Sequence, residues 1–349
     1  MKQVYVHNFN QYQLIEVQQP QLQSSHDIIV KVRATTVCGS DVHLLEGHMH
    51  TPWGFALGHE FVGVVHAVGD NVQNFQVGER VVAPAAPWCN QCAQCKRGQI
   101  QVCERGGIFG SGERFGNLGG AQSEYVRIPY ADSCVVKIPD QVTNMQALTV
   151  GDILATGWSA VKNAVQQVGQ SLVVFGTGPI GLSAVHTARL AGVSQVIAID
   201  TLQDRLDLAK QLGADYTINP LQEDVTQRVL ELTQNRGAEA IVDAVGVPNT
   251  IHAWAGVAAV GAKVAMVGIP SQPIALDFAH LLHKNISIWT GLGDLRCMQM
   301  LMDMIATGVL DPSPIFTEQV PFQQIEKTIA EFIAKKPGLV KPFIELSGG

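Results

Sequence analysis

The sequence lacks the features that point to a membrane or to nucleic acid. Its 349 residues contain no apolar run long enough to span a bilayer. Its 23 lysine and arginine residues are scattered, and the formal net charge is −7, so the basic surface of a nucleic-acid-binding protein is not indicated. Internal repeats and low-complexity linkers are also missing, and 46% hydrophobic with 15% charged residues is ordinary for a folded chain. We therefore expect neither a membrane nor a nucleic-acid partner.

The chain also begins without a secretory signal peptide, and this absence bears on its seven cysteines. Four of them, Cys89, Cys92, Cys95 and Cys103, form a Cys-x2-Cys-x2-Cys-x7-Cys pattern. Disulfide pairs would need an oxidising compartment, whereas the missing leader favours a reducing cytoplasm. Closely spaced thiolates in one loop can hold zinc as a tetrahedral structural ion. We therefore predict a structural zinc site in a cytoplasmic protein.

Two composition patterns divide the chain, whose length suits two domains. Residues 2 to about 132 alternate short apolar runs with glycine and proline, which predicts mostly β structure. From about residue 156, short buried strands alternate with segments of helical period, which predicts α/β structure with a parallel sheet. An amphipathic helix is expected at 321–335 and a final strand at 339–346. The expected domains are a discontinuous, mostly β domain at 1–153 and 294–349, and an α/β domain at 154–293.

A glycine-rich turn follows the apolar run 172–175. It reads Gly176-Thr177-Gly178-Pro179-Ile180-Gly181 and opens a segment of helical period. The glycines permit a tight turn and close approach of the backbone, while the amino end of the helix offers N–H groups to a pyrophosphate. Asp200 ends the next apolar strand, where a carboxylate accepts hydrogen bonds from the ribose hydroxyls of a dinucleotide. This context predicts a Rossmann doubly wound domain rather than a glycine-rich packing turn.

Asp200 also favours NAD over NADP. A carboxylate would repel the 2′-phosphate of NADP, and residues 201–203 supply no cation to offset that repulsion. Arg205 lies slightly further along the chain and leaves two alternatives open: it flanks the adenosine ribose, or it reaches a 2′-phosphate. We expect NAD as the cofactor.

Two further segments combine residue types that bind zinc. The first reads Cys38-Gly39-Ser40-Asp41-Val42-His43 and the second Gly58-His59-Glu60-Phe61-Val62-Gly63. Beside a Rossmann-like half and a four-cysteine loop, these segments indicate a second zinc site with an open coordination position. With these motifs, and with Gly69 and Val72, the chain resembles the zinc-dependent medium-chain alcohol dehydrogenase family nearly end to end. That resemblance implies a GroES-like, mostly β catalytic domain plus a Rossmann NAD-binding domain.

The resemblance implies a catalytic zinc held by Cys38, His59 and Asp152. Many relatives carry Cys at the third position, and a harder oxygen donor there should leave zinc a somewhat stronger Lewis acid. For Glu60 the resemblance leaves two alternatives: a transient zinc ligand, or a carboxylate outside the coordination sphere that supports the ligands. Two zinc ions per chain are therefore expected.

The resemblance also implies roles in hydride transfer. Zinc would bind the substrate oxygen and lower the pKa of the alcohol, and hydride would pass from the carbinol carbon to the nicotinamide. Ser40 matches the hydroxyl that contacts the substrate oxygen, and His43 matches the histidine that hands the proton to solvent through the cofactor ribose. A surface histidine is the alternative for His43. The remaining expected cofactor contacts, beyond the glycines, Asp200 and Arg205, are Thr156, Pro179, Ile180, Val245, Val267 and Ile269.

The substrate is predicted only as a class. Ala85 matches a family position that often carries a bulky aromatic, so the pocket should admit a branched or larger substrate, with Trp53 and Ile269 lining the remainder. We expect a primary or secondary alcohol and its carbonyl partner, then a polyol, then formaldehyde. The rival hypotheses are a metal-free quinone or enoyl reductase of the same fold and a retired dehydrogenase that serves as a binding protein.

The remaining features concern packing. The apolar run 286–289 is the last strand of the Rossmann half, and an exposed apolar edge strand favours pairing across a symmetric dimer. We expect a homotetramer, with a dimer as the alternative. Cys134, in a strand-like run, and Cys297, in a methionine-rich helix, are interpreted as packed apolar side chains rather than ligands.

Overall fold

The computed structural model describes residues 1–346 and divides the chain into two compact units. The first unit combines residues 1–152 with the segment that begins at Asp294, and the second unit is residues 153–293. Within the described residues, no helix combines the length and the apolar character needed to cross a bilayer. The assignment of one unit to catalysis and the other to cofactor binding stays a prediction.

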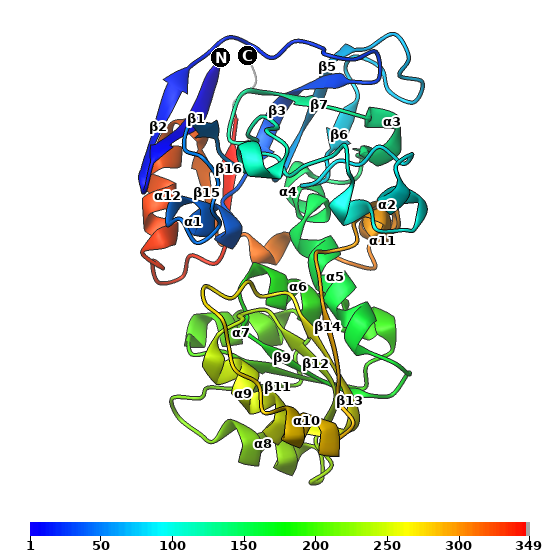
Figure 1. Cartoon of the computed structure of the whole chain (residues 1–349), viewed down its shortest axis with the longest axis vertical. Helices are drawn as coiled ribbons and strands as arrows, with labels where there is room; N and C mark the ends of the chain where they lie inside the picture. Colours follow the sequence, from blue (N-terminus) through cyan, green and yellow to red (C-terminus); the bar gives the residue numbers. More distant parts are fainter. Residues whose placement is uncertain (347–349) are drawn as a thin grey trace. The chain divides into compact units, whose positions relative to one another are not determined.

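The first unit contains a seven-stranded sheet and a three-stranded sheet (Figure 1). In the larger sheet the strand order is β15-β16-β3-β5-β6-β8, and β7 also pairs with β3; in the smaller sheet the order is β2-β1-β4. The described pairs are antiparallel except that of β15 with β16. The strands are β1 Lys2–Asn8, β2 Gln11–Glu16, β3 Ile28–Thr35, β4 Phe55–Ala56, β5 Phe61–Val68, β6 Arg80–Val82, β7 Tyr125–Ile128, β8 Val136–Lys137, β15 Glu318–Pro321 and β16 Pro342–Glu345.

The pairing of β3 with β5 brings two distant motifs together. Thr35, at the end of β3, lies opposite Phe61, at the start of β5. The segment after β3 and the segment before β5 therefore lie side by side, and these segments carry Cys38 and His59. Close approach of the strands depends on Gly63, where a Cβ would collide with the backbone of β3.

The helices of the first unit are short, and two of them refine the expectations from sequence. The amphipathic helix expected at 321–335 is α12, which follows a 3₁₀ turn at Phe322–Gln324. Cys134 ends a helix instead of lying in a strand, because Tyr130 adopts a left-handed conformation (φ +55°) that turns the chain into that helix. The helices are α1 Gly39–Leu45, α2 Ala93–Lys96, α3 Ala131–Cys134, α4 Asn144–Leu148, α11 Met298–Ala306 and α12 Ile325–Ile333.

The second unit is a six-stranded parallel sheet in the order β11-β10-β9-β12-β13-β14, with helices on both faces (Figure 1). The central strands β9, β10 and β12 consist almost entirely of buried residues, as a sheet covered on both faces requires, whereas the edge strands β11 and β14 are partly exposed. The strands are β9 Ser171–Phe175, β10 Gln195–Ile199, β11 Tyr216–Ile218, β12 Ala238–Asp243, β13 Ala258–Met266 and β14 Ser287–Thr290. The helices are α5 Ile153–Ala164, α6 Pro179–Thr187, α7 Gln203–Gln211, α8 Val225–Leu232, α9 Pro248–Val257 and α10 Phe278–His283.

The strand order reverses between β9 and β12. From β9 the chain passes to β10 and β11 on one side, and β12, β13 and β14 continue on the other. In a parallel sheet, ligands bind outside the carboxyl ends of the strands at such a switch point. The turn after β9 is the glycine-rich segment 176–181, which the fold therefore places where a ligand would bind.

Candidate metal centres and dinucleotide site

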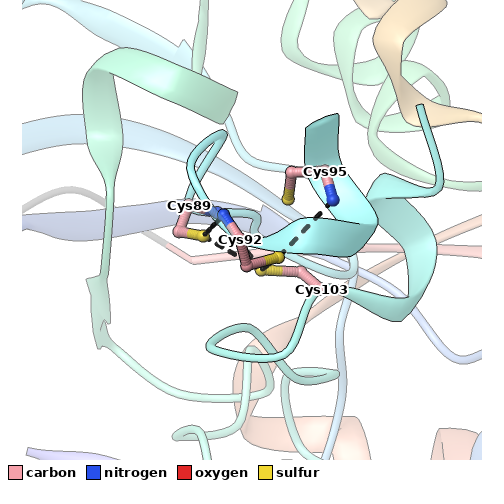
Figure 2. Close-up of side chains that lie close together, drawn as sticks. All are labelled: Cys89, Cys92, Cys95 and Cys103. Carbon is pink, nitrogen blue, oxygen red and sulfur yellow. Dashed lines mark hydrogen bonds between the residues drawn. The ribbon is translucent and has the colours of Figure 1, made fainter. Parts of the chain in front are cut away.

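The four cysteines of the loop converge on one point (Figure 2). The Sγ atom of Cys103 lies 3.5 Å from that of Cys89 and 3.9 Å from that of Cys92. A zinc–sulfur distance of 2.3 Å in a tetrahedron corresponds to sulfur atoms about 3.8 Å apart. The observed spacing therefore fits a zinc ion, and all seven cysteines are free thiols rather than disulfides.

Backbone N–H groups of the loop donate hydrogen bonds to three of its sulfur atoms. The N–H of Cys89 donates to Sγ of Cys103 at 3.3 Å, that of Cys92 to Cys89 at 3.4 Å, and that of Cys95 to Cys92 at 3.5 Å. Hydrogen bonds to the charged form of a thiol favour the thiolate. The Cys95 amide accordingly lowers the pKa of Cys92 to about 6. The hydrogen bonds thus favour the thiolate of Cys92, whereas burial raises the pKa of Cys103 and raises that of Cys95 to about 12. A bound zinc ion would supply the positive charge that keeps all four sulfur atoms deprotonated.

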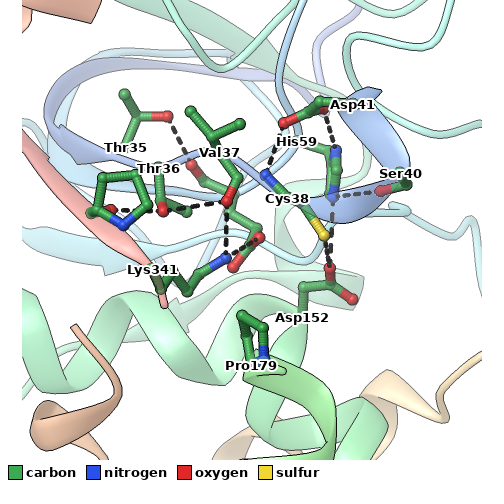
Figure 3. A network of polar contacts seen from close by, with 12 residues as sticks. Thr35, Thr36, Val37, Cys38, Ser40, Asp41, His59, Asp152, Pro179 and Lys341 are labelled. Atoms are coloured by element: carbon green, nitrogen blue, oxygen red, sulfur yellow. Dashed lines mark hydrogen bonds and ion pairs between the residues drawn. The ribbon is translucent and has the colours of Figure 1, made fainter. Parts of the chain in front are cut away.

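A second cluster joins Cys38, His59, Glu60 and Asp152, whose potential ligand atoms all lie within 4.8 Å of one another. Figure 3 shows the side chains of Cys38, His59 and Asp152 pointing toward one another. Oδ2 of Asp152 lies 3.3 Å from Nε2 of His59 and 4.0 Å from Sγ of Cys38. Asp152 follows the 3₁₀ turn Thr149–Gly151, so this residue reaches the ligands that β3 and β5 bring together. All four side chains belong to the first unit. One thiol, one imidazole and one carboxylate form a donor set that suits a divalent metal.

Asp41, to which the sequence assigned no role, orients this cluster. Its Oδ1 lies 3.2 Å from Nδ1 of His59, although the two atoms lack the alignment of a hydrogen bond. Its Oδ2 accepts from the N–H of Cys38 at 2.9 Å and from Nε2 of Gln122 at 3.2 Å. A carboxylate beside Nδ1 favours the tautomer with the proton on that nitrogen. The lone pair of Nε2 is then available on the side of Cys38 and Asp152.

The electrostatics of the cluster favour a cation. Burial lowers the pKa of His59. Asp41 and Asp152 raise that pKa by more than burial lowers it, so the net pKa lies well above the ordinary value for histidine. Acidic groups around a buried imidazole overcome its desolvation only when the local field strongly favours positive charge. The residues present therefore fit a metal ion at this position.

Glu60 is held by a buried lysine that sequence reasoning missed. Nζ of Lys341 lies 2.7 Å from Oε1 of Glu60 and 3.3 Å from the carbonyl oxygen of Val37, and the two charged side chains are 0% and 1% exposed. Burial opposes the charge of Lys341, but Glu60 raises the pKa of that ammonium group above its ordinary value. Oε2 of Glu60 has no hydrogen-bond partner among residues 1–346. The only signal in the sequence was a lysine inside the apolar run 339–344.

The residues expected to handle the substrate and its proton differ in their contacts with the ligands. Oγ of Ser40 is 3.3 Å from Nε2 of His59, so this hydroxyl adjoins the cluster. Ala85 is buried, and its N–H donates to the carbonyl oxygen of Gly151, one residue before Asp152. His43 lies further along α1 and faces His48 instead of the ligands.

Trp53 is an expected pocket residue that the described contacts do not join to the cluster. Its side chain is 38% exposed, and its ring stacks on Phe55 with centroids 6.4 Å apart. The expected role of Trp53 in substrate binding stays a prediction.

Two of the three glycines of the turn 176–181, Gly176 and Gly181, have a steric reason. Gly176 has φ +82°, and a Cβ there would collide with Val245. A Cβ at Gly181 would collide with the carbonyl oxygen of Gly176. At Gly178 the corresponding space is open, with a guanidinium nitrogen of Arg205 at 3.9 Å. The turn is thus compact on the sheet side and open where a pyrophosphate would approach the amino end of α6.

Asp200 is fixed at the carboxyl end of β10. Its Oδ2 accepts from the N–H of Thr177 at 2.7 Å and from Oγ1 of the same residue at 3.0 Å, and its Oδ1 accepts from the N–H of Leu202 at 3.0 Å. A carboxylate tied to the glycine-rich turn in this way cannot move far when a ligand binds. The half-buried side chain keeps acceptor capacity for ribose hydroxyls.

The other expected cofactor residues lie in the second unit. Thr156 is in α5, and a Cβ at Gly293 would collide with its hydroxyl. Ile180 is in the first turn of α6 and is partly buried. Val245 follows β12, while Val267 and Ile269 follow β13, and Ile269 is 41% exposed. The structure therefore gathers most of these residues at the carboxyl ends of adjacent strands.

Comparison with known proteins decides the family. Residues 24–140 match the model of the alcohol dehydrogenase GroES-like domain, and residues 179–307 match that of the zinc-binding dehydrogenases. An alcohol dehydrogenase of Cupriavidus necator is 33% identical over 336 residues, which cover 90% of this chain and 91% of that protein. The chain belongs to the zinc-dependent medium-chain alcohol dehydrogenase family. It is therefore an oxidoreductase of the alcohol dehydrogenase type.

Two further relatives of this alcohol dehydrogenase family member are informative. An L-threonine 3-dehydrogenase of Bacillus subtilis is 33% identical, with 90% of each chain covered. The solved structure of the alcohol dehydrogenase TADH from Thermus sp. ATN1 matches with a TM-score of 0.94 and 34% identity over 99% of this chain and 100% of that chain. The predicted fold class, a GroES-like domain plus a Rossmann-type parallel sheet, is confirmed.

Proposed function

We propose that the protein is an NAD-dependent zinc alcohol dehydrogenase that interconverts a primary or secondary alcohol and its carbonyl partner. The observation that carries this proposal is the buried cluster of Cys38, His59 and Asp152 with the hydroxyl of Ser40 beside it. This set supplies three metal ligands and leaves the neighbouring hydroxyl to meet a substrate oxygen. The cysteine loop supplies a second, structural zinc site, so two zinc ions per chain are expected.

The metal, the cofactor and three residues of the chain would each have a separate role in alcohol oxidation. Bound zinc supplies Lewis acidity that lowers the pKa of the alcohol, and bound NAD supplies the hydride acceptor. Asp41 holds the imidazole of His59 in the tautomer that can bind a metal. Ser40 would hydrogen-bond the substrate oxygen and accept the alcohol proton at Oγ while its own hydroxyl proton moves on toward His43, which would conduct that proton to solvent.

Two observations support the substrate class. Ala85 is a small residue joined through its backbone to the segment that carries Asp152, so side-chain bulk is absent at that point. The related B. subtilis protein is named for threonine, whose 3-hydroxyl is a secondary alcohol. Secondary alcohols therefore deserve the first assays, followed by primary alcohols.

Cofactor choice is tested through Asp200. At an effective dielectric of 20, two unit charges 4 Å apart repel by about 4 kcal/mol, and partial exposure reduces that value. We expect NAD to be preferred over NADP by at least roughly a hundredfold in kcat/KM, which corresponds to about 2.7 kcal/mol. Asp200→Asn keeps an acceptor oxygen for Thr177 but removes the charge, so most of that preference should disappear.

Asp207→Asn is the matched control, since this carboxylate lies on the exposed side of α7 and contacts Gln203. The control should keep the preference of the unmodified enzyme. Equal use of NAD and NADP by the unmodified enzyme would contradict the role of Asp200 and make Arg205 the residue to test. A lack of dehydrogenase activity with every alcohol and both cofactors would contradict the proposed function itself.

A further inference from the structure

Two histidines beyond the metal ligands face each other. His43 lies on α1, and His48 follows shortly after the end of that helix. Their Nδ1 atoms are 3.3 Å apart, and their rings have centroids 5.5 Å apart with an interplanar angle of 57°. A neutral pair in this geometry shares one proton between the two nitrogens, with one ring as donor and the other as acceptor.

The backbone between the rings holds this arrangement. Gly47 has φ +69°, and its N–H donates to the carbonyl oxygen of Leu44 at 3.1 Å. Glycine adopts this left-handed conformation without a steric cost, which ends α1 and reverses the chain. The N–H of Met49 then donates to the carbonyl oxygen of His43 at 3.0 Å. His48 is therefore directed at His43 by the turn itself.

His48 is exposed and lies beside a carboxylate, whereas His43 is partly buried. Burial and the nearby His48 lower the pKa of His43, and Glu46 opposes that shift only in part, so His43 is neutral near neutral pH. The side chain of His48 is 41% exposed, and its Nδ1 lies 3.5 Å from Oε2 of Glu46. An imidazolium at His48 is thus hydrated and paired with a carboxylate.

We propose that His48 is the proton acceptor behind His43 and acts only through it. His43 takes up the alcohol proton at Nε2 and gives its Nδ1 proton to the lone pair on Nδ1 of His48. His48 becomes an imidazolium beside Glu46 and releases its Nε2 proton to water, so one proton enters the pair and one leaves. Between turnovers a solvent proton enters His48 at Nε2, the Nδ1 proton returns to His43, and His43 loses its Nε2 proton to water. This inference rests on the proposed function, in which His43 conducts the alcohol proton.

The experiment compares His48→Gln with His50→Gln, an exposed histidine of the same loop, in the zinc-loaded enzyme. General acid–base groups contribute about 10²–10⁴-fold, and His48 assists His43 without replacing it. We therefore expect kcat for alcohol oxidation by H48Q to fall about tenfold near neutral pH, with unchanged KM values. The difference in kcat between H48Q and the unmodified enzyme should narrow at higher pH, where hydroxide removes the proton from His43 directly. Added MOPS buffer should raise the kcat of H48Q by accepting the same proton.

Nitrogen NMR gives a readout that does not depend on turnover. The Nδ1 resonance of His43, assigned by its loss in His43→Gln, should shift in H48Q and stay in place in H50Q. Identical rates, pH profiles and buffer dependence for H48Q and H50Q would overturn the inference. In that case, impaired oxidation by H43Q would leave the proposed function standing, whereas an unmodified enzyme that oxidises no alcohol would remove both.

Discussion

The buried ion pair between Glu60 and Lys341 leads to a quantitative stability prediction. Lys341→Met keeps an apolar stem but removes the ammonium group, so Glu60 is left as a buried carboxylate without its cation. Removing one partner of a buried pair costs about 3–5 kcal/mol. In the zinc-loaded protein we expect Lys341→Met to lower the free energy of unfolding by about 3 kcal/mol, at the lower end of that range. A divalent cation bound beside Glu60 would replace part of the lost positive charge.

The sign of the pH dependence follows from the burial of Glu60. Burial raises the pKa of this carboxyl group, and in the variant no ammonium group opposes the shift. The folded variant then holds a proton more tightly than the unfolded chain, whose glutamate titrates near 4.3. Its free energy of unfolding should therefore fall as the pH rises above about 4.3, until the folded-state pKa is passed. The destabilisation should be small in acid and large near neutral pH.

Hydrogen exchange of peptides from β3 and β16 measures the local free energy of unfolding of this sheet. A loss of about 3 kcal/mol should speed their exchange roughly 150-fold. The double variant E60Q/K341M should recover most of the loss because no buried charge remains. Lys336→Met is the matched control, since this lysine also pairs with glutamates but is 40% exposed, so its loss should have little effect. Unchanged exchange in K341M, or a double variant as unstable as K341M alone, would refute the reasoning.

Three further predictions concern the zinc sites, the glycine-rich turn and assembly. Cys95→Ser should lower stability and reduce the zinc content of each chain from about two ions to about one. Cys38→Ser should remove activity and leave the fold largely intact. Elemental analysis that finds no zinc in the unmodified protein would contradict both predictions. Gly181→Ala should abolish NAD binding measured by calorimetry, because the added Cβ collides with Gly176, and normal affinity would show that the turn adapts. The edge strand β14, with Ile288 39% exposed, should be covered in a tetramer or dimer, and sedimentation of a stable monomer at micromolar concentration would exclude that assembly.

The features that the sequence predicted well are local ones. The four cysteines lie in one loop, and the strand, glycine turn and following helix of the Rossmann half occupy one short stretch. Spacing along the chain is then nearly equivalent to spacing in the folded unit. The wider fold could be predicted as well, since buried parallel strands alternate with helices in a regular rhythm.

The supporting contacts of the metal cluster could not be predicted. Asp41 was visible in its motif, but its contact with His59 depends on the pairing of β3 with β5. Lys341 looked like a residue of an apolar strand, and only tertiary structure places it against Glu60. The facing of His43 and His48 depends on the left-handed turn at Gly47, which a single glycine in the sequence does not specify. Each of these contacts is set by backbone geometry rather than by residue spacing.

The position of Lys341 also has a consequence for folding during synthesis on the ribosome. Glu60 and Lys341 are 281 positions apart, and the whole second unit is translated between them. At about 5–20 residues per second, roughly 15–55 s separate the synthesis of the carboxylate from that of its cation. Synthesis of the contiguous second unit is completed within that interval. The larger sheet of the first unit cannot be completed until β16 has been synthesised. The end of translation therefore sets the earliest time at which the buried charge of Glu60 is neutralised by Lys341.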